Sequence, residues 1–279
     1  MKSFIHAANA QSTVAGNLAV DPNALPTLTQ MIQKNPLILI EYDPVGRLPI
    51  HRASHYETAC TTMEYISVIK GVSRKHIKKF LKSKIDGLIV NEKKGEVSFL
   101  EARSDPRKTG KHYTPLFVAA TSGAVQNVKC LIRLGANVNV TVVSHQLSGF
   151  TIIHQLCLEQ NKLPMKSLPQ DCNLEIMKMF ATKSNHTITG DEMSFGTEET
   201  VVQIMSLLVE GGADVNARDA KGRTAMSDAA VGGHINMVLA LANLGADVNN
   251  RDTGLIQNNS QSQFELELKG STPLMAAME

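Results

Sequence analysis

Apolar residues recur along this chain at helical spacing, in short amphipathic segments that each stop at a glycine. One segment carries Val128, Leu131 and Ile132 on a single face and ends at Gly135. Apolar residues three and four positions apart predict one buried helix face, and glycine suits the left-handed helix end. The same five-residue phrase, Gly-Ala-Asx-Val-Asn, directly follows three such segments, at residues 135–139, 212–216 and 245–249. This recurrence predicts one supersecondary unit used several times.

A second sequence motif, the opening phrase, marks the start of each unit. In the clearest example, the Thr114 hydroxyl can cap a helix and Pro115 is tolerated at its first position, while Gly123 suits a tight turn to a second helix. A second clear copy begins at 222–230, and weaker openings stand at 46–53, 149–156 and 270–277. Together the two phrases resemble the ankyrin repeat. The resemblance implies an all-α fold, an α-solenoid in which antiparallel helix pairs stack side by side.

The openings are 64, 39, 73 and 48 positions apart, whereas a regular ankyrin unit has about 33 residues. We expect an N-terminal segment at 1–27, whose order the sequence leaves open, and a repeat domain at 28–279. Its expected units are 46–70, 110–140, 149–216 with an insertion, 222–249 and an incomplete unit at 270–279. Because the last unit stops inside its first helix, we expect the natural protein to continue after residue 279.

The extra length falls into three insertions, at 71–109, 158–198 and 253–269. Insertions in a solenoid belong in its connections, and ankyrin units are linked by hairpin-shaped turns, so we expect lengthened β-hairpin fingers. The first insertion predicts a helix at 73–85 and a hairpin at 88–100. The second predicts a short helix at 174–181 and a hairpin at 187–195, and the last shows strand alternation at 264–268.

Composition narrows the class of protein. The chain is 43% hydrophobic, without Trp, and has no apolar run near the roughly 18 residues that a membrane span needs. Residues 1–25 lack the long apolar region of a secretory signal, so we expect no export signal of that kind. The four cysteines show no metal-ligand spacing and favour a reducing, cytoplasmic-type compartment; they are Cys60, Cys130, Cys157 and Cys172. We expect a monomer.

Charge is distributed unevenly. Residues 1–111 hold 17 Lys and Arg against 10 Asp and Glu, although the whole chain carries only +2. The excess centres on a basic patch without an acidic residue between 70 and 84, formed by Lys70, Arg74, Lys75, Lys78, Lys79, Lys82 and Lys84. Such a patch is either a solvated helix face or a site that attracts an acidic protein, RNA or anionic lipid. No array of aromatic residues accompanies it, which disfavours nucleic acid.

The sequence offers one tempting catalytic pair, His154 and Cys157, three apart on a predicted helix. The resemblance instead makes His154 the histidine of the opening phrase, which bonds between repeats, and His51 has the same position in its unit. The sequence shows no Gly-rich phosphate loop, nucleophile elbow or metal-ligand spacing. We therefore expect no catalytic, cofactor-binding or metal-binding site in this chain.

The resemblance implies a scaffold for protein–protein interaction. Loops carry function disproportionately, so we expect a partner protein to touch exposed finger residues: Glu92, Lys93, Lys94, Asp191, Glu192, Met193, Asn258, Asn259 and Gln261. The insertions also resemble those of ankyrin-repeat effectors that intracellular bacteria deliver into host cells, which would place the protein in the host cytosol or nucleus. Two alternatives remain: a targeting arm for an enzymatic domain after residue 279, and an RNA- or anionic-surface-binding protein.

One modification is also implied by the resemblance. Asn139, Asn216 and Asn249 each follow a leucine eight positions upstream. This context resembles the one in which an asparaginyl hydroxylase modifies ankyrin turns. The commoner alternative is an asparagine that bonds its own backbone in a turn.

Overall fold

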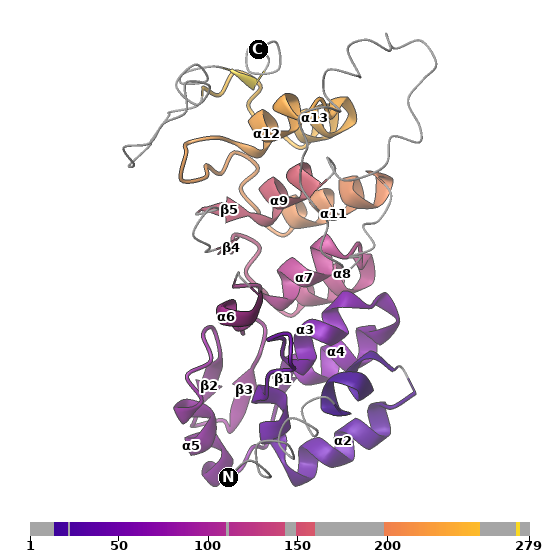
Figure 1. Cartoon of the computed structure of the whole chain (residues 1–279), viewed down its shortest axis with the longest axis vertical. Helices are drawn as coiled ribbons and strands as arrows, with labels where there is room; N and C mark the ends of the chain where they lie inside the picture. The colour runs from indigo at the N-terminus through magenta and orange to yellow at the C-terminus, as the bar shows by residue number, and fades with distance from the viewer. Residues whose placement is uncertain are drawn as a thin grey trace.

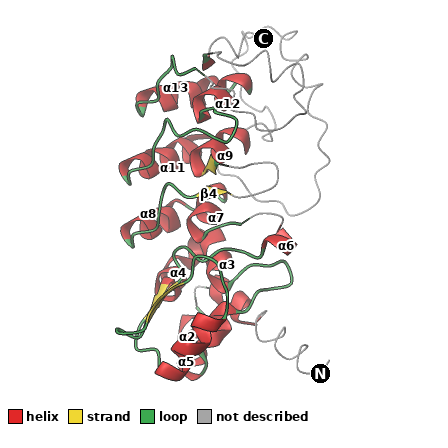
Figure 2. Ribbon diagram, turned by 90° about the vertical axis from the view of Figure 1, so that its left-hand side faces the viewer, coloured by secondary structure: helices red, strands yellow, loops and turns green. Residues whose placement is uncertain are grey.

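The computed structural model describes residues 14–21, 23–109, 112–142, 149–159, 198–251 and 272–273. Over these residues, pairs of helices follow one another along the long axis of the molecule in chain order (Figure 1). Seen from the side, the pairs lie one above the other as successive layers (Figure 2). The chain is an α-solenoid.

Each pair consists of a first helix and a second helix that returns beside it. The first helices are α3 (Pro49–His55), α7 (Pro115–Thr121), α9 (Ile152–Glu159) and α12 (Ala225–Val231), and the second helices are α4 (Cys60–Ser67), α8 (Val125–Arg133), α11 (Glu198–Glu210) and α13 (Ile235–Asn243). The first helices pack on one another in chain order, and α8 packs between α4 and α11. A continuous apolar core results, with Leu116, Leu131 and Ile152 almost fully buried.

Side-chain caps fix the start of the first helices. The Thr114 hydroxyl accepts the Phe117 N–H at 3.3 Å, and Thr224 does the same for Ser227. These bonds satisfy amide groups that lack a partner at a helix start.

An aspartate shapes the turn ahead of two openings. One carboxylate oxygen of Asp219 accepts the N–H groups of Lys221 and Arg223 at 2.9 and 2.8 Å, and the other binds the Arg223 guanidinium. Asp43 makes the same arrangement with Arg47. A buried carboxylate with several donors is well satisfied, so this turn is a second constant part of the unit.

Helical structure begins before residue 28, where the sequence analysis placed the start of the repeat domain. A helix covers 14–20, and its Ala15 and Ala19 are fully buried. Next come α2 (Leu25–Lys34) and the 3-10 helix η1 (Pro36–Ile40). Part of the N-terminal segment is therefore helical, and its small residues let this helix pack closely on the first pair, where the Arg52 guanidinium donates to the Asn17 side chain.

The first insertion lies between α4 and α7 and forms a small subdomain. The subdomain also takes in the residues just before the insertion, and its elements are β1 (Val68–Ile69), α5 (Arg74–Lys82), β2 (Ile89–Asn91), β3 (Glu96–Ser98) and α6 (Pro106–Thr109). The expected hairpin is present as β2 paired with β3, in register Val90 with Val97. The sequence missed β1, which pairs with β3 and makes a three-stranded antiparallel sheet in the order β1-β3-β2.

Helix α5 ends at Lys82, earlier than the expected Ile85. The Ser83 hydroxyl donates to the Phe80 carbonyl at 2.7 Å, and Lys84 has a left-handed φ of 54°. Both features terminate a helix. Gly87 then passes so close to the backbone that an added Cβ would lie 1.7 Å from the Glu101 carbonyl oxygen.

The remaining insertions lie largely outside the described residues. Residues 160–197 connect α9 to α11, the two helices of one pair. The insertion drawn inside the unit at 149–216 thus separates the two helices of that unit, whereas the hairpin-shaped turns lie between pairs. The short helix at 174–181, the hairpin at 187–195 and the strand at 264–268 fall outside the described ranges, as does most of the unit at 270–279. Between the second and third pairs, β4 (Thr141–Val142) meets β5 (Phe150–Thr151).

Candidate protein-interaction surface

The first insertion presents the basic patch on a firmly anchored helix. Ile77 and Phe80 of α5 are 2% and 1% exposed. Phe80 meets Phe99 edge to face with ring centroids 6.1 Å apart, a favoured aromatic arrangement. The apolar face of α5 is therefore buried against η1 and the sheet, and its cationic face is exposed to solvent.

All seven residues of the basic patch are exposed: Lys70, Arg74, Lys75, Lys78, Lys79, Lys82 and Lys84. Among the described residues, none of them takes part in an ion pair. Elsewhere arginines are paired, as Arg133 is with Glu64 at 2.7 Å. Unpaired like charges on one face create a positive potential that attracts anionic groups.

The hairpin tip lies beside this helix in the same subdomain. Glu92, Lys93 and Lys94 are exposed, and the Lys94 N–H donates to the Asn91 side chain at 3.1 Å. That bond folds the tip into a defined turn. The tip and the basic patch thus form one surface on the first insertion.

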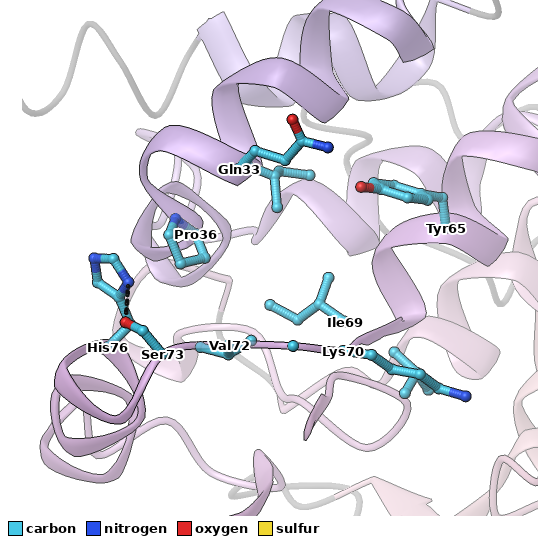
Figure 3. Close-up of a pocket in the computed structure, with 11 residues that line it drawn as sticks. Gln33, Pro36, Tyr65, Ile69, Lys70, Val72, Ser73 and His76 are labelled. Atoms are coloured by element: carbon cyan, nitrogen blue, oxygen red, sulfur yellow. Dashed lines mark hydrogen bonds between the residues drawn. The ribbon is translucent and has the colours of Figure 1, made fainter. Parts of the chain in front are cut away.

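A hollow of about 540 Å³ opens at the junction of α2, η1, α4 and the segment leading into α5. Figure 3 shows Gln33 and Pro36 on one side, Tyr65 on another, and the chain from Lys70 to Ser73 along a third. Apolar residues form much of its lining, namely Ile32, Pro36, Val68, Ile69 and Val72. The sequence analysis missed this hollow, because its walls come from segments about 30 positions apart.

The histidines of the opening phrase have structural roles. The His51 Nδ1 accepts the Leu48 N–H at 3.1 Å, so Nε2 carries the proton and donates to the Tyr113 carbonyl at 3.0 Å. His154 reaches the Arg223 carbonyl in the next unit in the same way, at 3.2 Å. Burial lowers the pKa of His51 to about 4 and also lowers the pKa of His154. Both rings are therefore neutral, and each forms a hydrogen bond from one unit to the next.

Cys157 does not form a nucleophile with His154. Its thiol is fully buried, and burial raises its pKa, with the charge of Asp228 adding to the rise. A catalytic cysteine needs a lowered pKa and access to substrate, and both ring nitrogens of His154 are already engaged. Within the described ranges, no three His, Cys, Asp or Glu side chains gather as a metal site would require.

The asparagines of the repeated phrase connect the units. The Asn139 side chain accepts the Asp214 N–H at 2.9 Å and donates to the Gly212 carbonyl at 3.0 Å. Asn216 makes the same two bonds to Asp247 and Gly245 at 2.8 and 3.4 Å. These two side chains therefore bond the next unit, and not their own backbone as a simple turn residue would. Asn249 is exposed, and hydroxylation of all three stays a prediction.

Six of the expected contact residues lie outside the described residues: Asp191, Glu192, Met193, Asn258, Asn259 and Gln261. The structure brings the other three, at the hairpin tip, together with the basic patch. None of the helices in the described part of the chain is long and apolar enough to cross a membrane.

Comparison with known proteins agrees with this architecture. Residues 111–141 match the ankyrin repeat model, and residues 193–252 match a model of ankyrin repeats in three copies. Over 150 residues, the chain is 28% identical to "Potassium channel AKT2/3" of Arabidopsis thaliana. That alignment covers 53% of this chain and only 17% of the channel. The matched segments contain the helix pairs α7–α8 and α12–α13 and the inter-unit asparagine bonds described above, so the chain carries ankyrin repeats.

Proposed function

We propose that this chain is a protein-recognition scaffold that uses its first insertion, together with the concave face of the repeats, to bind an acidic surface of a partner protein. Ankyrin repeats serve in protein–protein interaction and are typically not enzymes. The observation that supports this site is the basic patch, seven exposed cations without ion pairs among the described residues, of which five lie on a helix fixed by Ile77 and Phe80 and two flank it. A rigid charged surface loses little conformational entropy on binding.

The test compares partner capture by three forms of the full chain. The patch variant carries Lys78→Glu, Lys79→Glu and Lys82→Glu. The control carries the same change at three exposed lysines outside the patch, Lys108, Lys129 and Lys221. Partners are crosslinked in lysate of the source cells and identified by mass spectrometry. We expect the patch variant alone to lose its main partners, and equal capture by all three forms would refute the site.

A second candidate is an RNA or an anionic membrane surface, which the same seven cations favour. Neutralising several phosphates makes affinity fall steeply with salt. Nuclease treatment and removal of membranes by ultracentrifugation separate these candidates: loss of the captured material after nuclease assigns the patch to RNA, loss after membrane removal assigns it to a membrane surface, and survival of both treatments assigns it to protein.

The resemblance to delivered effectors supports a narrower proposal, that the partner is a host protein in the cytosol or nucleus. A targeting role beside an enzymatic domain after residue 279 is a further proposal. The mass of the endogenous protein tests the proposal of a further domain, and a value near 30.3 kDa would contradict it. Transfer of an epitope-tagged chain from the source cells into co-cultured host cells tests the proposal of a host partner.

A further inference from the structure

The hollow beside α5 is bounded on one side by main chain. Residues 68–73 line it without interruption, and Gly71 among them has no side chain to contribute. Figure 3 shows this stretch running along the hollow, with Gln33 and Pro36 across from it. The stretch continues directly from β1, an outer strand of the three-stranded sheet.

The pairing of β1 leaves backbone groups unused. The Phe99 N–H donates to the Ser67 carbonyl at 2.8 Å, and Ile69 is paired with Val97. Because alternate residues of an antiparallel strand point their N–H and C=O groups in opposite directions, those of Lys70 point away from β3. Among the described residues they have no hydrogen-bond partner. Such an edge is a template for another strand.

The walls suit an extended peptide. Apolar surface from Pro36, Val68 and Val72 can take alternate side chains of a strand, while Gln33 and Tyr65 offer polar groups at the rim. In strand addition, main-chain hydrogen bonds supply affinity and such pockets supply specificity. The volume of about 540 Å³ holds a few residues and is too small for a folded domain.

The charge around the hollow selects the composition of that peptide. Lys70 lines it, Lys34 is exposed on the adjoining helix, and Arg74 and Lys75 begin α5 next to Ser73. The nearest exposed acid on α4, Glu64, is already paired with Arg133. A segment with Glu or Asp at alternate positions would place its carboxylates toward these cations while its apolar residues face the hollow.

We propose that an extended acidic segment of the partner protein adds to the free edge of β1 and fills this hollow. The proposal rests on the protein-recognition function above and specifies how one part of the partner is held. The basic patch then steers the segment toward the hollow, since long-range attraction accelerates encounter.

The test uses the full chain and a fluorescent eight-residue peptide of alternating Glu and Val, with binding followed by anisotropy. Gln33→Trp fills the hollow without changing charge, and Gln126→Trp makes the same change at an exposed position on α8. Lys70→Glu with Arg74→Glu reverses charge at the hollow, and Lys129→Glu with Lys221→Glu does so at two exposed lysines outside the first insertion. We expect at least tenfold weaker binding for the first member of each pair and less than twofold change for the second.

Two further probes address the mode of binding. The same peptide methylated on alternate backbone nitrogens, prepared in both registers, keeps its charge but loses strand hydrogen bonds; we expect at least one register to bind tenfold more weakly. Strand addition is overturned if both methylated peptides bind as tightly as the parent peptide. It is also overturned if the parent peptide shows no saturable binding, or if an eight-nucleotide oligouridylate or a phosphatidylserine vesicle displaces the peptide from the hollow. These failures leave partner capture by the basic patch intact, so they are distinguishable from failure of the proposed function.

Discussion

His51 makes the stability of the first helix pair depend on pH. It is fully buried between neighbouring units, with both ring nitrogens in hydrogen bonds. The charged groups that act on it are Asp43 and Arg47, whose effects oppose each other, so burial dominates and lowers its pKa to about 4. We expect the folded protein to lose stability as the pH falls from neutral toward 4.

The sign and size follow from linkage. An unfolded histidine takes up a proton near pH 6.5, whereas His51 in the folded chain resists protonation until about pH 4. The stability that His51 contributes is therefore present above pH 6.5 and is lost as the pH falls from about 6.5 to about 4. A difference of this size corresponds to about 3 kcal/mol in total, of which about 2 kcal/mol is lost between pH 7.5 and pH 5. His154 acts in the same direction.

The assay is urea unfolding followed by circular dichroism at several pH values. His51→Gln removes the titrating ring but keeps an amide that can donate to the Tyr113 carbonyl. We expect this variant to be less stable at pH 7.5 and to lose about 2 kcal/mol less than the wild type on going to pH 5. His76→Gln, on the surface of α5, controls for loss of an imidazole. If His51→Gln showed the same fall with pH as the wild type, the reasoning would be refuted.

Two substitutions test the first insertion by thermal unfolding and by binding to the peptide probe. Gly87→Ala forces a Cβ against the Glu101 carbonyl and should lower the free energy of unfolding by about 2 to 4 kcal/mol. Its control, Gly71→Ala, is also at positive φ but has open space around it, and should lower the free energy of unfolding by about 1 kcal/mol. Equal losses would rule out the close approach of Gly87 to Glu101. Phe80→Ala should cost about 3 to 5 kcal/mol and weaken probe binding, because α5 loses its anchor. Leu81→Ala, at a residue that is 50% exposed, should change stability by less than about 1 kcal/mol, and a comparable loss there would contradict the docking of α5.

The regular part of the fold could be predicted because its signals are local. A cap such as Thr114, a turn glycine such as Gly123 and a stop such as Gly135 each act within a few residues, so the sequence displays them directly. The basic patch was equally visible, since its charges follow one another within 15 residues of sequence, on and beside one helix. The hairpin β2–β3 followed from alternation around a polar turn.

The rest depends on contacts that no local pattern records. Strand β1 has two residues and lies directly behind α4, so its pairing with β3 has no sequence signature of its own. The hollow requires Gln33, Tyr65 and Lys70 to meet from different elements.

The first insertion interrupts the array without breaking the bonds between units, and Glu101 explains how. Asn139 and Asn216 each accept a backbone N–H from the phrase of the following unit. The unit before Asn139 has no such asparagine, but the Glu101 carboxylate accepts the Asn137 N–H at 2.7 Å, which is the corresponding bond. Because a carboxylate accepts strongly, the insertion rejoins the regular frame at this point. The subdomain that carries the basic patch is therefore tied to the repeats at its exit, in addition to the packing of α5 on η1.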